Sequence, residues 1–252
     1  MKLSVSIPCF FRDIPLCDAV RRVAALGYTA VEAWAIPSDT DARELRAVCE
    51  REGVSFLALC PPESRMTSPE HRTLYLDGLK RGCENILSLG GSKLITQVGD
   101  DTGAPRPFQH ASILAALEGA KPILEEYGVT LMIEPLNTYF DHKGYYLDSS
   151  IEGFALVKEA GHPLIKVVYD IYHMQIMEGN IIPTVTANLD KIAHLHAAGH
   201  PGRREPWRGE NDYRFIFDAI DAAGYTGYCG LEYRPALSVE ESLKEAIKYY
   251  GK

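Results

Sequence analysis

Short apolar runs alternate with amphipathic stretches along the whole chain. The apolar runs are four to six residues long and nearly continuous, which is typical of parallel strands that are buried on both faces. Eight of these runs predict strands, at residues 3–6, 30–34, 55–59, 93–97, 130–134, 165–170, 192–196 and 227–232.

The stretches between these runs have the pattern of helices, and most of them stop at a glycine, as helices commonly do. They predict helices at residues 16–26, 41–52, 69–89, 108–127, 149–160, 215–223 and 239–250. Residues 182–189 give the weakest helical pattern, since Pro183 fits only near a helix start. No linker or low-complexity tract divides the sequence, so we expect one domain over residues 1–252.

Eight strand–helix units in 252 residues predict a single α/β domain, a closed (β/α)8 barrel of the TIM type. A doubly wound open sheet is the main alternative, and it usually carries a glycine-rich phosphate turn after the first strand. The corresponding stretch here reads SIPCFFRD and contains no glycine. The sequence therefore favours the barrel.

Composition and charge narrow the classes of partner. The net charge of −8 argues against nucleic acid, because binding phosphates needs a basic surface. No apolar run reaches the roughly 20 residues of a membrane span, and no signal peptide is recognisable. The six cysteines are scattered and form no C-x-x-C pair, which fits reduced thiols in a cytoplasmic protein.

The last four predicted strands each end in a residue that can bind a metal. These residues are Glu134, Asp170, His196 and Glu232, spaced by 36, 26 and 36 residues. In a barrel such strand ends share one face. Three carboxylates would repel one another there unless a cation neutralised them. One such carboxylate alone could simply be a helix cap or an ion pair. Four in succession predict a site for a divalent cation, Mn²⁺ or Mg²⁺, with Co²⁺ as a further option.

Several phrases, in order along the chain, resemble those of the hydroxypyruvate isomerase family. They are IEPLNT, YDIYHMQIMEGN, HPGRREP, GEND and GLEYRP, and they are densest between Glu134 and Pro235. That family belongs to the xylose-isomerase-like TIM barrels, which also include the ketose 3-epimerases. The resemblance implies a metal-dependent isomerase of a small hydroxy-carbonyl substrate, of the hydroxypyruvate to tartronate semialdehyde type.

The resemblance also implies roles for particular residues. Glu134 and Glu232 would bind the metal and also exchange the proton, and His173, one step into the loop after Asp170, would hold substrate oxygens. Arg203 would lie beside the site and suit an anionic or polyhydroxy substrate, and Glu210 would lie on the same rim. Barrels of this kind often form dimers, so a homo-oligomer is compatible with the sequence.

Two departures keep a ketose 3-epimerase as the alternative function. Hydroxypyruvate isomerases often carry glutamine where His196 stands, whereas the epimerases carry histidine. The epimerases in turn carry a second glutamate where Phe140 stands here. A barrel of the endonuclease IV group is a more remote alternative, which the acidic charge disfavours.

Overall fold

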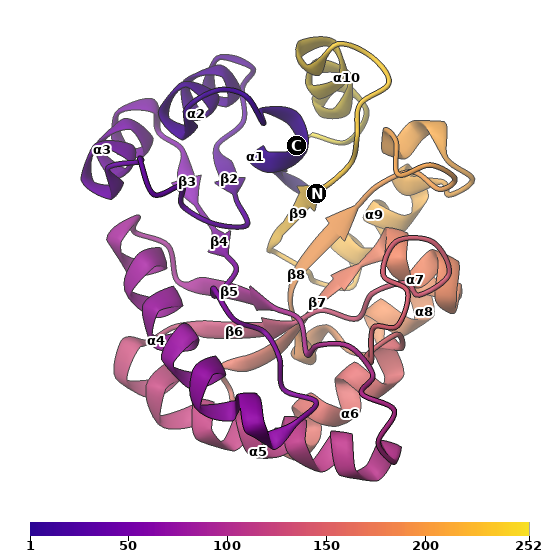
Figure 1. Cartoon of the computed structure of the whole chain (residues 1–252). Coiled ribbons are helices and arrows are strands. Elements are labelled where there is room, and N and C mark those ends of the chain that lie inside the picture. The colour runs from indigo at the N-terminus through magenta and orange to yellow at the C-terminus, as the bar shows by residue number, and fades with distance from the viewer. Residues whose placement is uncertain (252) are drawn as a thin grey trace.

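The strands form one parallel sheet that curls into a barrel (Figure 1). The computed structural model describes residues 1–251. The strands are joined in the order β3-β2-β1-β9-β8-β7-β6-β5-β4. Their bounds are β1 Lys2–Ser6, β2 Ala30–Glu32, β3 Ser55–Phe56, β4 Ala58–Leu59, β5 Lys93–Thr96, β6 Thr130–Ile133, β7 Ile165–Asp170, β8 Ile192–Ala197 and β9 Tyr228–Leu231. The predicted barrel is confirmed.

The third predicted strand consists of two short ones, because its two halves pair with different neighbours. β3 pairs with β2, whereas β4 pairs with β5. Between them, the Leu57 N–H donates to the Val31 carbonyl at 2.8 Å, so this segment stays bonded to β2 at the residue that separates β3 from β4. The segment from Ser55 to Leu59 therefore joins the two ends of the sheet.

Helices surround the sheet on the outside, as Figure 1 shows. Their bounds are α1 Ile7–Phe10, α2 Leu16–Ala25, α3 Ala42–Glu52, η1 Pro69–His71, α4 Arg72–Ser88, α5 Arg106–Tyr127, α6 Ser150–Ala160, α7 Ile171–Met177, α8 Ile181–Thr186, η2 Leu189–Lys191, η3 Pro206–Arg208, α9 Tyr213–Ala222 and α10 Val239–Tyr250. None of those within residues 1–251 has the length and apolar character needed to cross a membrane.

One local prediction was wrong, and a second was right in part. The stretch after Asp170 was expected to be a loop but forms α7, because the Asp170 carboxylate caps its first turn. The weak helix at 182–189 is α8 followed by the separate 3₁₀ turn η2, and Pro183 lies in the first turn of α8, as its pattern required.

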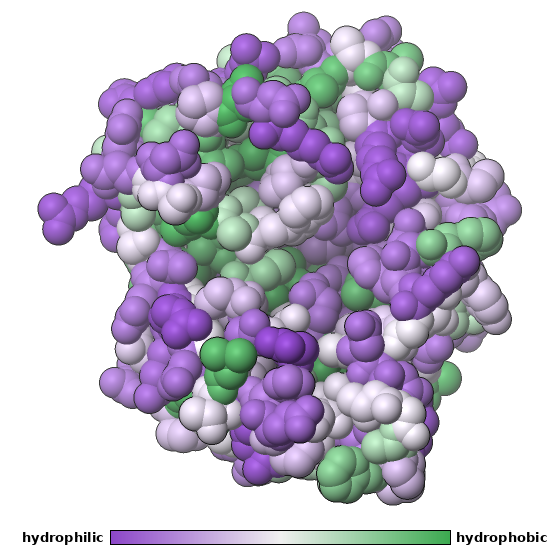
Figure 2. Space-filling model, in the orientation of Figure 1, coloured by the Kyte–Doolittle hydropathy of each residue, from purple (hydrophilic) through white to green (hydrophobic). Residues whose placement is uncertain are grey.

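The strands bury two apolar layers on opposite faces. Leu131 and Ile133 of β6 join the large core beneath the helices, whereas Met132 between them joins a small cluster with Ala58, Ile95 and Val168. Side chains alternate along a strand, so this small cluster lies inside the barrel. By the same alternation, Glu134 and Asp170 point inward, each two residues beyond an inner apolar residue. The face seen in Figure 2 is mostly hydrophilic, with hydrophobic residues gathered in a recess of its upper left part and scattered at a few places elsewhere.

We predict that Met132→Ala lowers the free energy of unfolding by about 2–5 kcal/mol, because it leaves a void in the small inner cluster. Ile151→Ala is the control, since the Ile151 side chain is 72% exposed on α6 and its loss should cost less than about 0.5 kcal/mol. Urea unfolding followed by circular dichroism measures both changes. Equal losses in the two variants would contradict the inner packing.

Candidate active site

A cavity of about 490 Å³ opens at the carboxyl ends of the strands. Trp34, Ile95 and Leu136 give it apolar walls, and acidic and imidazole side chains occupy another part of its lining. This is the end of a barrel at which loops and strand termini can bring distant residues together. Glu134, His196 and Glu232 all line the cavity.

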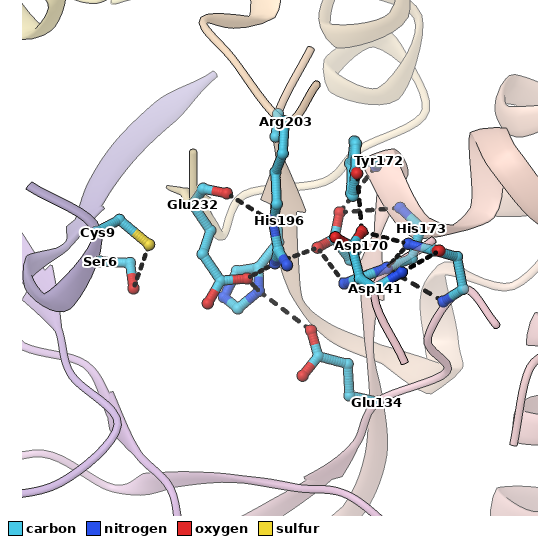
Figure 3. A network of polar contacts seen from close by, with 12 residues as sticks. Ser6, Cys9, Glu134, Asp141, Asp170, Tyr172, His173, His196, Arg203 and Glu232 are labelled. Carbon is cyan, nitrogen blue, oxygen red and sulfur yellow. Dashed lines mark hydrogen bonds and ion pairs between the residues drawn. The ribbon is translucent and has the colours of Figure 1, made fainter. Parts of the chain in front are cut away.

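The four predicted metal ligands lie together in the structure. Each offers one atom, and these four atoms all lie within 4.8 Å of one another. The His196 Nδ1 lies 3.4 Å from Glu134 Oε1 and 3.5 Å from Glu232 Oε2. Figure 3 shows the side chains converging from different strands. The alternation of residues along β6, β7, β8 and β9 is what turns them toward a common centre.

Three of the facing atoms are buried and have no hydrogen-bond partner among the described residues. They are Glu134 Oε1, Asp170 Oδ2 and His196 Nδ1. Leaving such atoms unpaired is costly, so a group that binds them all is favoured. An octahedral cation with ligands at about 2.1 Å would separate neighbouring ligand atoms by about 3 Å and opposite ones by about 4 Å. The residues present therefore fit a divalent cation.

Asp170 uses its two oxygens differently. Oδ1 accepts hydrogen bonds from the backbone N–H groups of Tyr172 at 2.8 Å and His173 at 3.4 Å, and so caps α7. Oδ2 is the unpartnered atom in the cluster. The helix-cap interpretation and the metal-ligand interpretation are thus compatible, because each concerns a different oxygen of the same carboxylate.

Glu32, at the end of β2, fixes the orientation of the His196 ring. Its Oε2 lies 3.2 Å from His196 Nε2 and 3.0 Å from His194 Nε2, and the Ser4 hydroxyl donates to its Oε1 at 3.0 Å. An imidazole that donates from Nε2 keeps its Nδ1 lone pair for a metal. Gly230 makes room for this carboxylate, since a Cβ there would collide with Glu32 Oε1.

Glu32, His194 and His196 could in principle bind a metal themselves, since they also lie within ligand distance of one another. However, Glu32 Oε2 already accepts from both rings at hydrogen-bond distance. Burial alone would raise the pKa of Glu32, but the two histidines hold it well below its ordinary value. We therefore interpret Glu32 as the hydrogen-bond partner that holds His196 in place. His194, which shares this carboxylate, is a buried core histidine and not a metal ligand.

The neighbouring charges and the burial of the cluster shift the pKa values of its ionisable side chains. Burial raises the pKa of Asp170 to about 7, although Arg203 and His196 act against it. Burial alone would lower the pKa of His196, but Glu32, Glu134 and Glu232 raise it well above its ordinary value. A divalent cation would compete with these protons for the same atoms.

His173 faces the cavity as a neutral hydrogen-bond donor. Its Nδ1 lies 3.1 Å from the backbone nitrogen of Asn137 and 2.7 Å from the Asn137 side-chain nitrogen. Both nitrogens donate, so Nδ1 accepts and the proton lies on Nε2. Burial, together with Arg203, keeps the pKa of His173 well below its ordinary value. The buried Nε2 has no hydrogen-bond partner and lies 3.5 Å from Asp170 Oδ2.

The other two predicted substrate-binding residues differ in position. Arg203 lines the cavity, and its guanidinium donates from Nη2 to Glu232 Oε2 at 2.7 Å and from Nε to the Glu232 carbonyl at 3.3 Å. Glu210 is exposed, does not line the cavity, and accepts from Gln175 Nε2 at 3.1 Å. Arg203 is therefore close to the cluster and Glu210 is not.

Glu32 and Asn137, which hold His196 and His173 in place, were not among the predicted site residues. Glu32 carried a usable signal, because a carboxylate inside an apolar strand must be paired when it is buried. Its exposed fraction is 2%. Asn137 gave no such signal, since an asparagine after a strand is common in loops.

The chain belongs to the family of xylose isomerase-like TIM barrels, whose model matches residues 20–251. It is 30% identical to the 2-oxo-tetronate isomerase of Cupriavidus necator, covering all of this chain and 99% of that one. It is 29% identical to the hydroxypyruvate isomerase of Escherichia coli, over 97% of each. These relatives identify the chain as an enzyme of the isomerase type.

A solved structure described as an AP endonuclease of family 2 from Brucella melitensis superimposes with a TM-score of 0.92 at 25% identity. The match covers 99% of this chain and 100% of that one. The barrel fold is therefore shared between proteins that carry different names.

We predict that Glu32→Gln lowers the affinity for Mn²⁺ about 10- to 100-fold, because the amide cannot hold both histidines in the same tautomer. Ser4→Ala is the matched control, since it removes a hydrogen bond to the other oxygen of Glu32 and leaves both histidine contacts. Isothermal titration calorimetry measures the affinities, and circular dichroism checks the fold. Unchanged affinity in a folded Glu32→Gln variant would contradict the role of Glu32.

Proposed function

We propose that this protein is a metal-dependent isomerase of a small hydroxy-keto acid, of the hydroxypyruvate isomerase type. The observation that carries the proposal is the cluster of unpartnered buried atoms between Glu134 and Glu232. Two carboxylates beside a cation site can take a proton from one carbon and return one to its neighbour. The named relatives act on hydroxypyruvate or 2-oxo-tetronate, which supports an acid substrate.

Glu134, Asp170, His196 and Glu232 would hold the cation. Three carboxylates and one imidazole suit Mn²⁺ or Mg²⁺, and Co²⁺ is also compatible with them. A divalent cation here would stabilise the negative charge that develops on the carbonyl and hydroxyl oxygens of the substrate. The neighbouring C–H proton would then be easier to remove.

The two glutamates would exchange the proton. For hydroxypyruvate, one carboxylate takes a proton from C3, and the other residue, as the acid, returns one to C2, while the hydroxyl proton moves to the former carbonyl oxygen. The product has its carbonyl at C3, as in tartronate semialdehyde. Glu232 is firmly oriented for this role, since Trp34 Nε1 donates to its Oε1 at 3.1 Å and Arg203 to its Oε2.

His173 would position the substrate. Its Nε2–H has no hydrogen-bond partner and lies at the same buried end of the barrel as the cluster, where it can donate to a substrate oxygen. Because Asn137 occupies Nδ1, the ring cannot turn its lone pair toward the substrate without losing two hydrogen bonds. A fixed donor of this kind keeps the reacting carbons between the two glutamates.

A ketose 3-epimerase is the second candidate, and the His196 ligand favours it. Epimerisation would return the proton to the same carbon from the opposite face, with the same pair of glutamates. Phe140 speaks against it, because this side chain is 64% exposed and offers no carboxylate where the epimerases carry one. The net charge of −8 disfavours an endonuclease.

We predict that the Mn²⁺-loaded protein in D₂O converts hydroxypyruvate with label at C2 of the product, as followed by NMR. Glu232→Gln should lower kcat by at least about 100-fold, because it removes one proton carrier. Glu210→Gln is the matched control and should keep near-normal activity, since Glu210 does not line the cavity.

Ketohexoses and ketopentoses are tested in parallel. Label at C3 of a ketose with inversion would favour the epimerase instead. No exchange with any substrate at a fully loaded metal site would overturn the enzymatic proposal.

A further inference from the structure

We propose that Arg234 binds the carboxylate of the substrate and so selects acids over neutral sugars. This inference rests on the proposed function and concerns the same cavity. Arg234 lies two residues after Glu232, and it lines the cavity with an exposed side chain. Its backbone N–H donates to the Arg203 carbonyl at 2.8 Å, which anchors the residue beside the cluster. No hydrogen bond or ion pair engages its guanidinium among residues 1–251.

The other cation of the cavity is already engaged. Arg203 donates to Glu232 Oε2 at 2.7 Å, lies 3.9 Å from Asp170 Oδ2, and packs over the Tyr172 ring at 5.2 Å. A substrate carboxylate that took this guanidinium would leave a buried carboxylate of the cluster without its partner, which is costly. Arg203 therefore serves Glu232, and Arg234 is free for an incoming anion.

The balance of charge calls for a second cation when the substrate is an acid. Four buried carboxylates face or adjoin the cavity, namely Glu32, Glu134, Asp170 and Glu232. Against these four, a dication and Arg203 together supply three positive charges, and Lys93, which does not line the cavity, interacts with Glu32. No positive charge is then left for an anionic substrate, and Arg234 supplies one. A neutral ketose has no such requirement.

The remaining lining gives the carboxylate no comparable charged partner. Trp34, Ile95 and Leu136 are apolar, and Gln97 is a neutral donor that lies 3.4 Å from Glu134 Oε2. Burial lowers the pKa of His142 and His173, which also line the cavity, and so favours their neutral forms. An arginine can form two parallel hydrogen bonds to a carboxylate. Anchoring one end of the substrate at Arg234 would leave its hydroxy-carbonyl carbons to the glutamates.

The test compares Arg234→Gln and Arg234→Lys with Arg12→Gln. Arg12 is an exposed arginine that lines a neighbouring groove and not this cavity, so it controls for a general loss of charge. With hydroxypyruvate, Arg234→Gln should raise KM about 10- to 100-fold with a small change in kcat, and Arg234→Lys should restore part of the loss. Arg12→Gln should leave KM near normal.

Binding is measured separately by isothermal titration calorimetry of hydroxypyruvate and of neutral dihydroxyacetone with the Mn²⁺-loaded protein. Arg234→Gln should weaken only the acid. Unchanged affinity for hydroxypyruvate, or an equal loss for both compounds, would overturn the role of Arg234. Tight Arg234-dependent binding without turnover would instead contradict the proposed isomerisation and leave the carboxylate site supported.

Discussion

Mutual repulsion among buried carboxylates is the constraint on which the rest of this site depends. Glu134, Asp170 and Glu232 share one small volume with Glu32 close behind them, and none of the four is more than 7% exposed. Such a cluster is stable only if cations and hydrogen-bond donors compensate it. Arg203, the Asp170 cap and the histidines each provide part of this compensation. Three of the four atoms that face the common centre, namely Glu134 Oε1, Asp170 Oδ2 and His196 Nδ1, have no hydrogen-bond partner among the described residues. This arrangement is the physical basis for proposing a metal there.

A second layer of residues holds the histidines in the tautomers that the chemistry needs. Glu32 turns the Nδ1 lone pair of His196 toward the cluster, and Asn137 leaves the Nε2–H of His173 to face the cavity. The two rings thus act in opposite ways, one as an acceptor toward a cation and the other as a donor toward substrate. The two arginines also have different roles. Arg203 supports the carboxylate of Glu232, and Arg234 is proposed to bind the carboxylate of the substrate.

Much of the fold could be predicted because strands buried on both faces leave continuous apolar runs, and β7 has the same bounds as its predicted strand. The convergence of the four strand-end residues followed from the barrel alone. Helix α7 was not predicted, because its sequence has no clear helical spacing of apolar residues. The helix starts where the Asp170 side chain caps its first turn. Glu210 was expected on the rim of the site and does not line the cavity, and the partner of Arg203 was not foreseen. Arg203 and Glu210 lie in the same connection between β8 and α9. Its path depends on a left-handed backbone conformation at Arg203, with φ of 52°, which the sequence pattern does not encode.

The central claim is that the four strand-end residues hold one divalent cation. The most direct measurement is a crystal structure of the protein soaked in Mn²⁺, with the ion located by anomalous scattering. We predict one strong peak about 2.1–2.3 Å from Glu134 Oε1, Asp170 Oδ2, His196 Nδ1 and Glu232 Oε2. A peak among Glu32, His194 and His196 instead, or no peak at saturating Mn²⁺, would contradict it.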